Sequence, residues 1–296
     1  MRIAVTGKAG QVVTSLIERG TAAGYEVIAL GRPELDLADP ASVARALEVA
    51  APDAIVSAAA YTAVDKAESE SDLAHAVNGA GAGAVAQAAR ALGVPLVHIS
   101  TDYVFDGTLG RPYVESDLTG PTGAYGASKL AGEQAVLAAH GDNSAVLRVA
   151  WVYSPFGANF VKTMLRLAGD RDEVSVVADQ FGNPTSAFDI ADGIIRVATN
   201  MVSDGNPALR GVFHMTASGE ASWADFAEAI FAASAEHGGP TAQVKRITTA
   251  DYPTPAKRPA SSRLDCGLIA QLHGVALPDW HQSLDRVIAR LHSTVA

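Results

Sequence analysis

The sequence is poor in cysteine: Cys266 is the only one among 296 residues, so no intramolecular disulfide can form. This scarcity is typical of a reducing compartment, and we expect Cys266 to be a small packing residue. Long apolar runs are also missing. The stretch that starts at Met1 is too short for a signal peptide, and no run reaches the ~18 apolar residues of a membrane span. We therefore expect a cytoplasmic protein with no membrane partner.

Charged residues are scarce too, at 18% of the chain, and the 22 basic residues are outnumbered by 32 acidic ones. The resulting net charge of −10 disfavours broad binding to nucleic-acid backbones or to anionic lipid, so we expect no nucleic-acid partner. Any nucleotide would have to be held by local groups. The apolar content of 48% excludes a disordered chain, and the length suits one large or two modest domains.

The first half of the chain alternates short β-branched runs with longer alanine-rich segments, which is typical of a parallel sheet with helical crossovers. Five buried strands are predicted, at 2–6, 26–30, 53–57, 95–99 and 145–149. Four helices are predicted between them, at 11–22, 40–50, 67–92 and 123–139, and Pro40 behind Asp39 suits the first position of a capped helix.

A second region begins after Tyr153, where loop-like segments appear. It contains predicted helices at 160–168, 188–201, 223–235 and 284–291, strands at 174–178 and 211–215, and an extended segment at 252–259, where three prolines forbid a helix. Helix 188–201 and strand 211–215 can return to the first sheet. We therefore expect two interleaved domains, one formed by 1–154 and 188–215 and the other by 155–187 and 216–296.

The turn after the first predicted strand carries two glycines, Gly7 and Gly10. Glycines at this place permit a tight turn and let a pyrophosphate approach the backbone amides that open the next helix, those of Gln11 and Val12. Val13 stands where the third glycine of the usual fingerprint would fall, so the motif alone is weak. A structural turn without a ligand is the alternative.

Arg32 follows the end of the second predicted strand, where many dinucleotide-binding folds carry an acidic residue for the ribose. A cation there suits the 2′-phosphate of NADPH, although Arg32 as a solvated loop charge remains an alternative. Further cofactor contacts are expected along the same carboxyl edge of the sheet, at Asp36, Leu37, Ala58, Ala59 and Ala60.

Tyr125 and Lys129 are four residues apart on a predicted helix, so both side chains project from one face. A cation near the phenol favours its ionised form, so we expect Lys129 to lower the pKa of Tyr125 and to make it a better proton donor or acceptor. Thr101 lies just after the fourth predicted strand, at the same sheet edge, where its hydroxyl can hold a substrate oxygen. The alternative is that Thr101 caps a local turn.

These residues lie in a set of blocks that resembles a known family. The blocks are the turn 7–11, AAAYTAVDKAE at 58–68, STDYVFDG at 100–107, the pair Tyr125 and Lys129, RVAWVY at 148–153, DQFGNPT at 179–185 and RPASSRL at 258–264. Together they resemble the dTDP-4-dehydrorhamnose reductase family of extended short-chain dehydrogenases/reductases. The resemblance covers nearly the whole chain.

The resemblance implies a doubly wound parallel sheet (a Rossmann fold) with a smaller, interleaved C-terminal α/β substrate domain. It implies reduction of a dTDP-4-dehydro-6-deoxyhexose at C4 by NADPH or NADH, specifically of dTDP-4-dehydro-L-rhamnose to dTDP-L-rhamnose, in a deoxysugar-nucleotide route such as one toward cell-wall polysaccharide. Thr101, Tyr125 and Lys129 would be catalytic, with Tyr125 and Lys129 also binding cofactor. The implied substrate contacts are Val64, Tyr103, Phe105, Trp151 and Arg258.

Two departures from the family pattern bear on assembly and substrate contacts. Ser15 stands where some relatives carry a glutamate used in a metal-bridged dimer, so we expect no metal and a monomer or weak homodimer. Ser261 replaces a more usual asparagine and leaves the sugar or diphosphate contacts there open.

Alternative functions also remain. They are reduction of another dTDP-deoxysugar, a sugar-nucleotide 4,6-dehydratase and a non-catalytic regulatory subunit. Asp102 followed by Tyr103, rather than by glutamate, disfavours the dehydratase, and the intact pair of Tyr125 and Lys129 disfavours the regulatory subunit.

Overall fold

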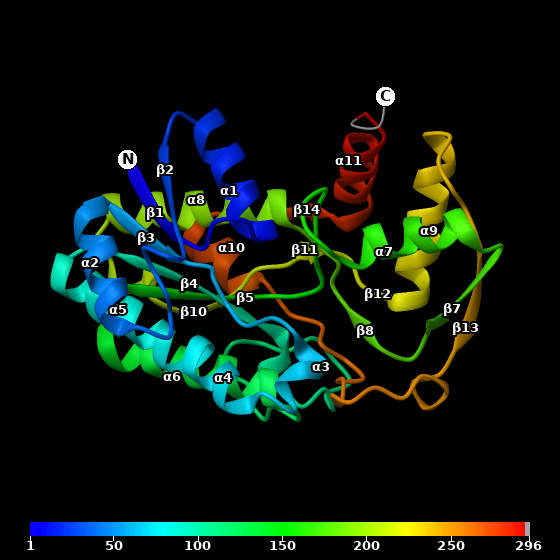
Figure 1. The fold of residues 1–296 in the computed structure, drawn as a ribbon, viewed down its shortest axis with the longest axis horizontal. Helices are drawn as coiled ribbons and strands as arrows, with labels where there is room; N and C mark the ends of the chain where they lie inside the picture. Colours follow the sequence, from blue (N-terminus) through cyan, green and yellow to red (C-terminus); the bar gives the residue numbers. More distant parts are fainter. Residues whose placement is uncertain (294–296) are drawn as a thin grey trace.

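The computed structural model describes residues 1–293, and its centre is a six-stranded sheet in the order β10-β5-β4-β3-β1-β2 (Figure 1). Every pairing in this sheet is parallel, from Thr6 beside Leu30 to Thr101 beside Val149. The strands are β1 (Arg2–Thr6), β2 (Glu26–Leu30), β3 (Ala54–Ser57), β4 (Leu96–Thr101), β5 (Ser144–Val149) and β10 (Gly211–His214). The predicted return of the chain to the first sheet is confirmed by β10.

Helices cover both faces of this sheet, as expected for strands that are apolar on both sides. Helices α1 (Gln11–Ala22) and α8 (Ala187–Ser203) pack on one face, and α2 (Pro40–Ala50), α5 (Ala82–Leu92) and α6 (Ala124–His140) cover the other (Figure 1). The predicted cap of α2 is confirmed, because Asp39 accepts a hydrogen bond from the amide of Ala41 and Pro40 follows it.

The prediction of one helix over 67–92 is wrong. The segment contains α3 (Val64–Ala67), α4 (Ser71–His75), a π-helical turn at Ala76–Gly81 and α5. The wider turn brings Asn78 inward, where its side chain hydrogen-bonds the backbone of Tyr61 and the hydroxyl of Ser128. An alanine-rich pattern has no feature that marks such a change of helical period.

Much of the chain after Tyr153, apart from α8 and β10, forms a smaller lobe with its own apolar core, which includes Tyr153, Met164, Phe226, Trp280 and Ile288 (Figure 1). Its main elements are α7 (Phe160–Asp170), β7 (Glu173–Val177), α9 (Trp223–Glu236), β13 (Gln243–Ile247) and α11 (Trp280–Ser293), with β7 and β13 paired in parallel. Between β13 and α11 lies α10 (Gly267–His273), and the predicted extended segment 252–259 is confirmed as non-helical. Short strand pairs link the lobe: β6 (Val152–Tyr153), β8 (Phe181–Gly182), β9 (Thr185–Ser186), β11 (Ala217–Ser218), β12 (Ala221–Ser222) and β14 (Leu277–Asp279).

The strand order places the functional edge. From β1 the chain moves outward to β2, then crosses back to β3 on the other side, so a crevice opens between β1 and β3 at their carboxyl ends. Within residues 1–293, no helix is both long and apolar enough to cross a membrane. Cys266 is a free, partly buried thiol that packs beside Thr216, as predicted for a small packing residue.

Candidate active site

Two adjoining cavities lie along the carboxyl edge of the sheet, and they share Gly7, Ala9, Ala59 and Ala60. The first has a volume of about 690 Å³ and reaches from the glycine turn to Thr101, Tyr125 and the smaller lobe. The second, of about 760 Å³, lies over the ends of β1 and β2. All the residues predicted for a cofactor line one or the other: Gly7, Gly10, Gln11, Val12, Arg32, Asp36, Leu37, Ala58, Ala59, Ala60, Tyr125 and Lys129.

The glycine turn has the construction that a pyrophosphate site needs. Gly7 has a φ of +103°, and a Cβ there would meet Val13 at 3.2 Å and Ala59 at 3.5 Å. Gly10 precedes α1 without any side-chain cap, so the first amides of the helix point to the cavity with no protein acceptor among the described side chains. Val13 fills the space behind Gly7, which explains how the turn forms without a third glycine.

The second cavity combines apolar walls with two cations. Leu73 and Val77 form part of the wall, while Lys8 and Arg32 lie at its polar end. The ammonium of Lys8 contacts Glu34 at 2.5 Å and the carbonyl of Arg32 at 3.2 Å. The exposed guanidinium of Arg32 has no side-chain partner among residues 1–293, so it is available to an anion in this cavity.

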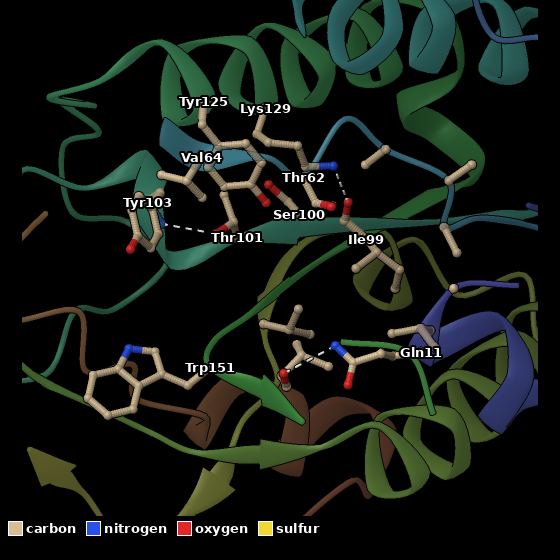
Figure 2. A pocket seen from close by; sticks show the side chains of 18 of the residues that line it. Gln11, Thr62, Val64, Ile99, Ser100, Thr101, Tyr103, Tyr125, Lys129 and Trp151 are labelled. Carbon is tan, nitrogen blue, oxygen red and sulfur yellow. Dashed lines mark hydrogen bonds between the residues drawn. The ribbon is translucent and has the colours of Figure 1, made fainter. Parts of the chain in front are cut away.

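Thr101, Tyr125 and Lys129 come together from two elements, the end of β4 and the first turns of α6 (Figure 2). Figure 2 shows Tyr125 and Lys129 descending from the helix onto the strand that carries Thr101. Gly126 permits this close packing, because any side chain at that position would overlap the carbonyl oxygen of Tyr103. The predicted juxtaposition of these three side chains is therefore present.

The expected lowering of the Tyr125 pKa is wrong for the chain as described. Burial raises the pKa of Tyr125 above its ordinary value of 10, and the nearby carboxyl of Asp102 adds to the rise, while the nearby hydroxyl of Thr101 opposes it. Lys129 does not point its charge at the phenol. Its ammonium donates to the carbonyl oxygen of Ile99 at 2.6 Å, beneath the strand end.

Lys129 itself is 4% exposed, and burial lowers its pKa to about 8, partly offset by Glu133 one turn further along α6. Glu133 forms a buried ion pair with Arg148 at 2.7 Å and accepts a hydrogen bond from Ser100 at 2.5 Å. This network lies directly behind the cavity, because Ser100 and Lys129 both line it. It fixes the strand end and the helix relative to each other.

The smaller lobe supplies an aromatic wall. Trp151 has a φ of +46°, a left-handed conformation that costs a bulky residue about 1–3 kcal/mol and turns its indole into the first cavity. The indole stacks on Trp223 with ring centres 3.5 Å apart, and any side chain at Gly182 would overlap it. Tyr103 and Val64 face this wall across the cavity, as Figure 2 shows, so these two predicted substrate contacts and Trp151 share one space.

The expected substrate contact at Phe105 is wrong. Its ring is 1% exposed, lines neither cavity, and stacks on Tyr113 with centres 4.1 Å apart. Phe105 packs with Val104, Tyr113 and Leu264 in a small separate core, and that packing keeps it from the site. Arg258 also lies outside the cavity lining, at its rim, where it donates to Asp65 at 3.0 Å and lies beside Tyr103.

Several cavity residues were missed by the sequence reasoning. Asp102 and Ser100 flank Thr101 in the chain, so their proximity was the available signal. Trp223 and Phe160 come from predicted helices of the second region, and nothing in their local pattern indicates which face meets the first domain. Lys8 lies inside the glycine turn and lines the second cavity, and its place between the two glycines was the available signal.

Ser15, the position compared with a metal ligand, is fully buried in α1, and its hydroxyl has no partner. The position therefore offers no surface group for a bridging metal. In the described part of the chain, no group of three or more His, Cys, Asp or Glu side chains could hold a metal ion.

The family model described as RmlD substrate binding domain matches residues 1–293. A dTDP-4-dehydrorhamnose reductase from Sinorhizobium fredii is 52% identical over 288 residues, which cover 97% of each chain, and one from Escherichia coli is 41% identical over the full length of both. The chain belongs to the dTDP-4-dehydrorhamnose reductase family. The resemblance inferred from the motif blocks is thereby confirmed.

Solved structures give the same result for the reductase family. A dTDP-4-dehydrorhamnose reductase from Clostridium acetobutylicum is 37% identical with a TM-score of 0.90, and one from Bacillus anthracis, in complex with NADP, is 35% identical with a TM-score of 0.89. Each comparison covers 98% of this chain and 99% of the other. A dTDP-glucose 4,6-dehydratase from Streptomyces venezuelae shares the fold alone, at 20% identity and a TM-score of 0.80. The predicted Rossmann fold is thus confirmed.

Proposed function

We propose that this protein uses NADPH to reduce the C4 ketone of dTDP-4-dehydro-L-rhamnose to the alcohol of dTDP-L-rhamnose. The observation that carries the proposal is the single cavity that joins an uncapped glycine turn to Thr101, Tyr125 and Lys129. The family relationship gives the substrate class, and the NADP complex of the Bacillus anthracis relative supports the cofactor. The division at 1–154 and 188–215 against 155–187 and 216–296 is part of this proposal and is supported by the separate core of the smaller lobe. Ile269 and Val275 pack instead in the core of the first domain, and 294–296 lie outside the described residues.

The residues present fit NADPH, with the turn from Gly7 to Val12 for the pyrophosphate and Arg32 for the 2′-phosphate. When bound, NADPH would supply a hydride for C4. Tyr125 donates its proton to the oxygen of the former ketone, and the raised pKa of its phenol keeps that proton in place until negative charge develops. Thr101 donates a hydrogen bond to the same oxygen, and Lys129 holds the cofactor ribose and supplies positive charge.

The proposal is tested by following NADPH absorbance with dTDP-4-dehydro-6-deoxyglucose and a 3,5-epimerase present, then identifying the product by NMR. We expect stoichiometric NADPH oxidation and dTDP-L-rhamnose. Without the epimerase, turnover should be much slower, which is the control for the stereochemistry at C3 and C5. Absence of NADPH oxidation would contradict the reductase assignment, whereas a different deoxysugar would contradict the assigned substrate.

Replacing Arg32 by alanine should weaken NADPH binding and leave NADH binding nearly unchanged. A charge-assisted contact with the 2′-phosphate is worth roughly 1.5–3 kcal/mol, so the ratio of the two affinities should fall by about 10–100-fold. Fluorescence titration of both cofactors measures this ratio. Arg45→Ala, an exposed cation on α2 outside both cavities, is the matched control. Equal ratios in wild type and Arg32→Ala would remove Arg32 from the cofactor site.

EDTA should leave both the activity and the assembly state unchanged. Ser15 offers no carboxylate ligand, and the hydride transfer proposed here gains its stabilisation from Thr101, Tyr125 and Lys129 rather than from a Lewis acid. We infer a monomer or weak homodimer. Size-exclusion chromatography with light scattering, run with and without EDTA beside the rate assay, checks both expectations. A loss of activity that magnesium restores would contradict them.

A further inference from the structure

Asp102 is a buried carboxyl directly beside the proposed catalytic hydroxyl. It opens the short 3-10 helix Asp102–Val104 that follows β4, is 2% exposed, and lines the first cavity. Within residues 1–293 no lysine or arginine forms an ion pair with it. A carboxyl in this position is costly to ionise, and the mechanism described above gives it no task.

The hydrogen bonds of Thr101 determine the direction in which its hydroxyl proton points. Its hydroxyl accepts from the amide of Tyr103 at 3.2 Å and donates to the Asp102 carboxyl oxygen Oδ1 at 2.9 Å. A threonine hydroxyl has only one proton to donate. While Asp102 is ionised, that proton is directed to Asp102, and Thr101 cannot donate it to a substrate oxygen.

We propose that Asp102 is a positioning residue that acts through Thr101, so that only its protonated form leaves the Thr101 hydroxyl proton free for the substrate oxygen. This inference rests on the proposed function, in which Thr101 donates to the developing alkoxide. A protonated Asp102 donates to Thr101 Oγ1, which reverses the bond between them. The Thr101 proton is then free for the cavity, where Thr101 lies beside the phenol of Tyr125 (Figure 2).

The surroundings of Asp102 favour the protonated form. Burial raises its pKa to about 6, and the hydroxyls of Ser262 and Thr101 offset this only in part. The titratable groups that face it are the phenols of Tyr103 on its own helix and Tyr125 on α6. Arg258 and Asp65 act on Tyr103 from the C-terminal loop and α3.

The pH dependence of kcat/KM tests the inference, using initial rates of NADPH oxidation from about pH 5 to about pH 9. In wild type, we expect kcat/KM to fall near pH 6 by about tenfold per pH unit, toward a plateau about 10²-fold lower, because one alkoxide donor is lost. A separate fall near pH 8 belongs to Lys129. Asp102→Asn and Thr101→Val should each remove the first fall and keep the second. Asp65→Asn, the matched carboxylate control, should keep both.

Three outcomes would overturn the inference: a wild-type profile without a fall near pH 6, an Asp102→Asn profile that keeps it, or a Thr101→Val profile that keeps it. Failure of the proposed function is distinct, since wild type would then oxidise no NADPH at any pH.

The coupling between Asp102 and Thr101 remains measurable in that case through the stability of the protein. Relative to Asp102→Asn, the wild-type free energy of unfolding should decrease with pH up to about 6 and then level off. Thr101→Val should raise the pH at which this decrease in the free energy of unfolding ends. If Thr101→Val leaves that pH unchanged, the inference is also overturned.

Discussion

Replacing Tyr125 by phenylalanine should lower kcat by about 10²–10⁴ and leave cofactor affinity nearly unchanged. The phenol is the only group in the proposed mechanism that passes a proton to the substrate oxygen. Phenylalanine keeps the ring and its edge-on contact with Tyr103, whose ring centre is 5.7 Å away, so the packing of α6 against the cavity should persist. The loss would therefore report the missing acid rather than a displaced helix.

The assay must follow NADPH oxidation with a 4-keto sugar nucleotide, because a dehydratase would also lose activity when its tyrosine is removed. Cofactor binding by Tyr125→Phe, measured by fluorescence titration, controls for a damaged site. Tyr25→Phe, on the far side of the sheet near Thr199, is a matched loss of one phenol outside the cavity. A variant that keeps more than about a tenth of the wild-type kcat would remove Tyr125 as the acid.

The sheet could be predicted closely from the sequence because its strands are short, apolar on both faces and bounded by turns. Residues 2–6 and 26–30 match β1 and β2, and the other three strands differ by at most two residues at either end. The local sequence pattern fails to predict the secondary structure where contacts between distant residues determine it. The break in 67–92 depends on Asn78 reaching Tyr61 and Ser128, and neither partner is near enough in the chain to mark it.

The sequence was enough to predict where the candidate site lies, at the carboxyl edge of the sheet, but not the pKa values of its side chains. Thr101, Tyr125 and Lys129 meet as their positions on β4 and α6 require. The pKa of Tyr125 rises instead of falling because burial depends on the surrounding fold, and Lys129 bonds the backbone beneath it. Phe105 fails for a related reason: a motif indicates proximity along the chain, while the 3-10 helix Asp102–Val104 turns Phe105 into a separate core and away from the cavity.

Replacing Glu133 by alanine should lower the free energy of unfolding by about 3–5 kcal/mol. Glu133 and Arg148 are 2% and 4% exposed and are joined by two hydrogen bonds, of 2.9 and 2.7 Å. Without the carboxylate, the guanidinium of Arg148 stays buried beside His214, and Ser100 loses its acceptor. Urea unfolding near pH 7, analysed with a constant m-value, measures the change.

The surface ion pair between Arg19 and Asp192 is the matched control, because both side chains are more than two-fifths exposed. Asp192→Ala should cost at most about 1 kcal/mol. The double variant Glu133→Leu with Arg148→Met should recover part of the loss, since it leaves no buried charge unpaired. Equal costs for Glu133→Ala and Asp192→Ala would contradict the view that burial makes the inner pair matter.

The same substitution should reach the active site through Lys129. Glu133 raises the pKa of Lys129 against the effect of burial, so its removal should shift the alkaline fall of kcat/KM from near pH 8 to lower pH. Lys129 would then be neutral in more of the enzyme at pH 7. If Glu133→Ala is destabilised while that alkaline fall keeps its midpoint, the buried pair supports the fold alone, and the positive charge of Lys129 is maintained without it.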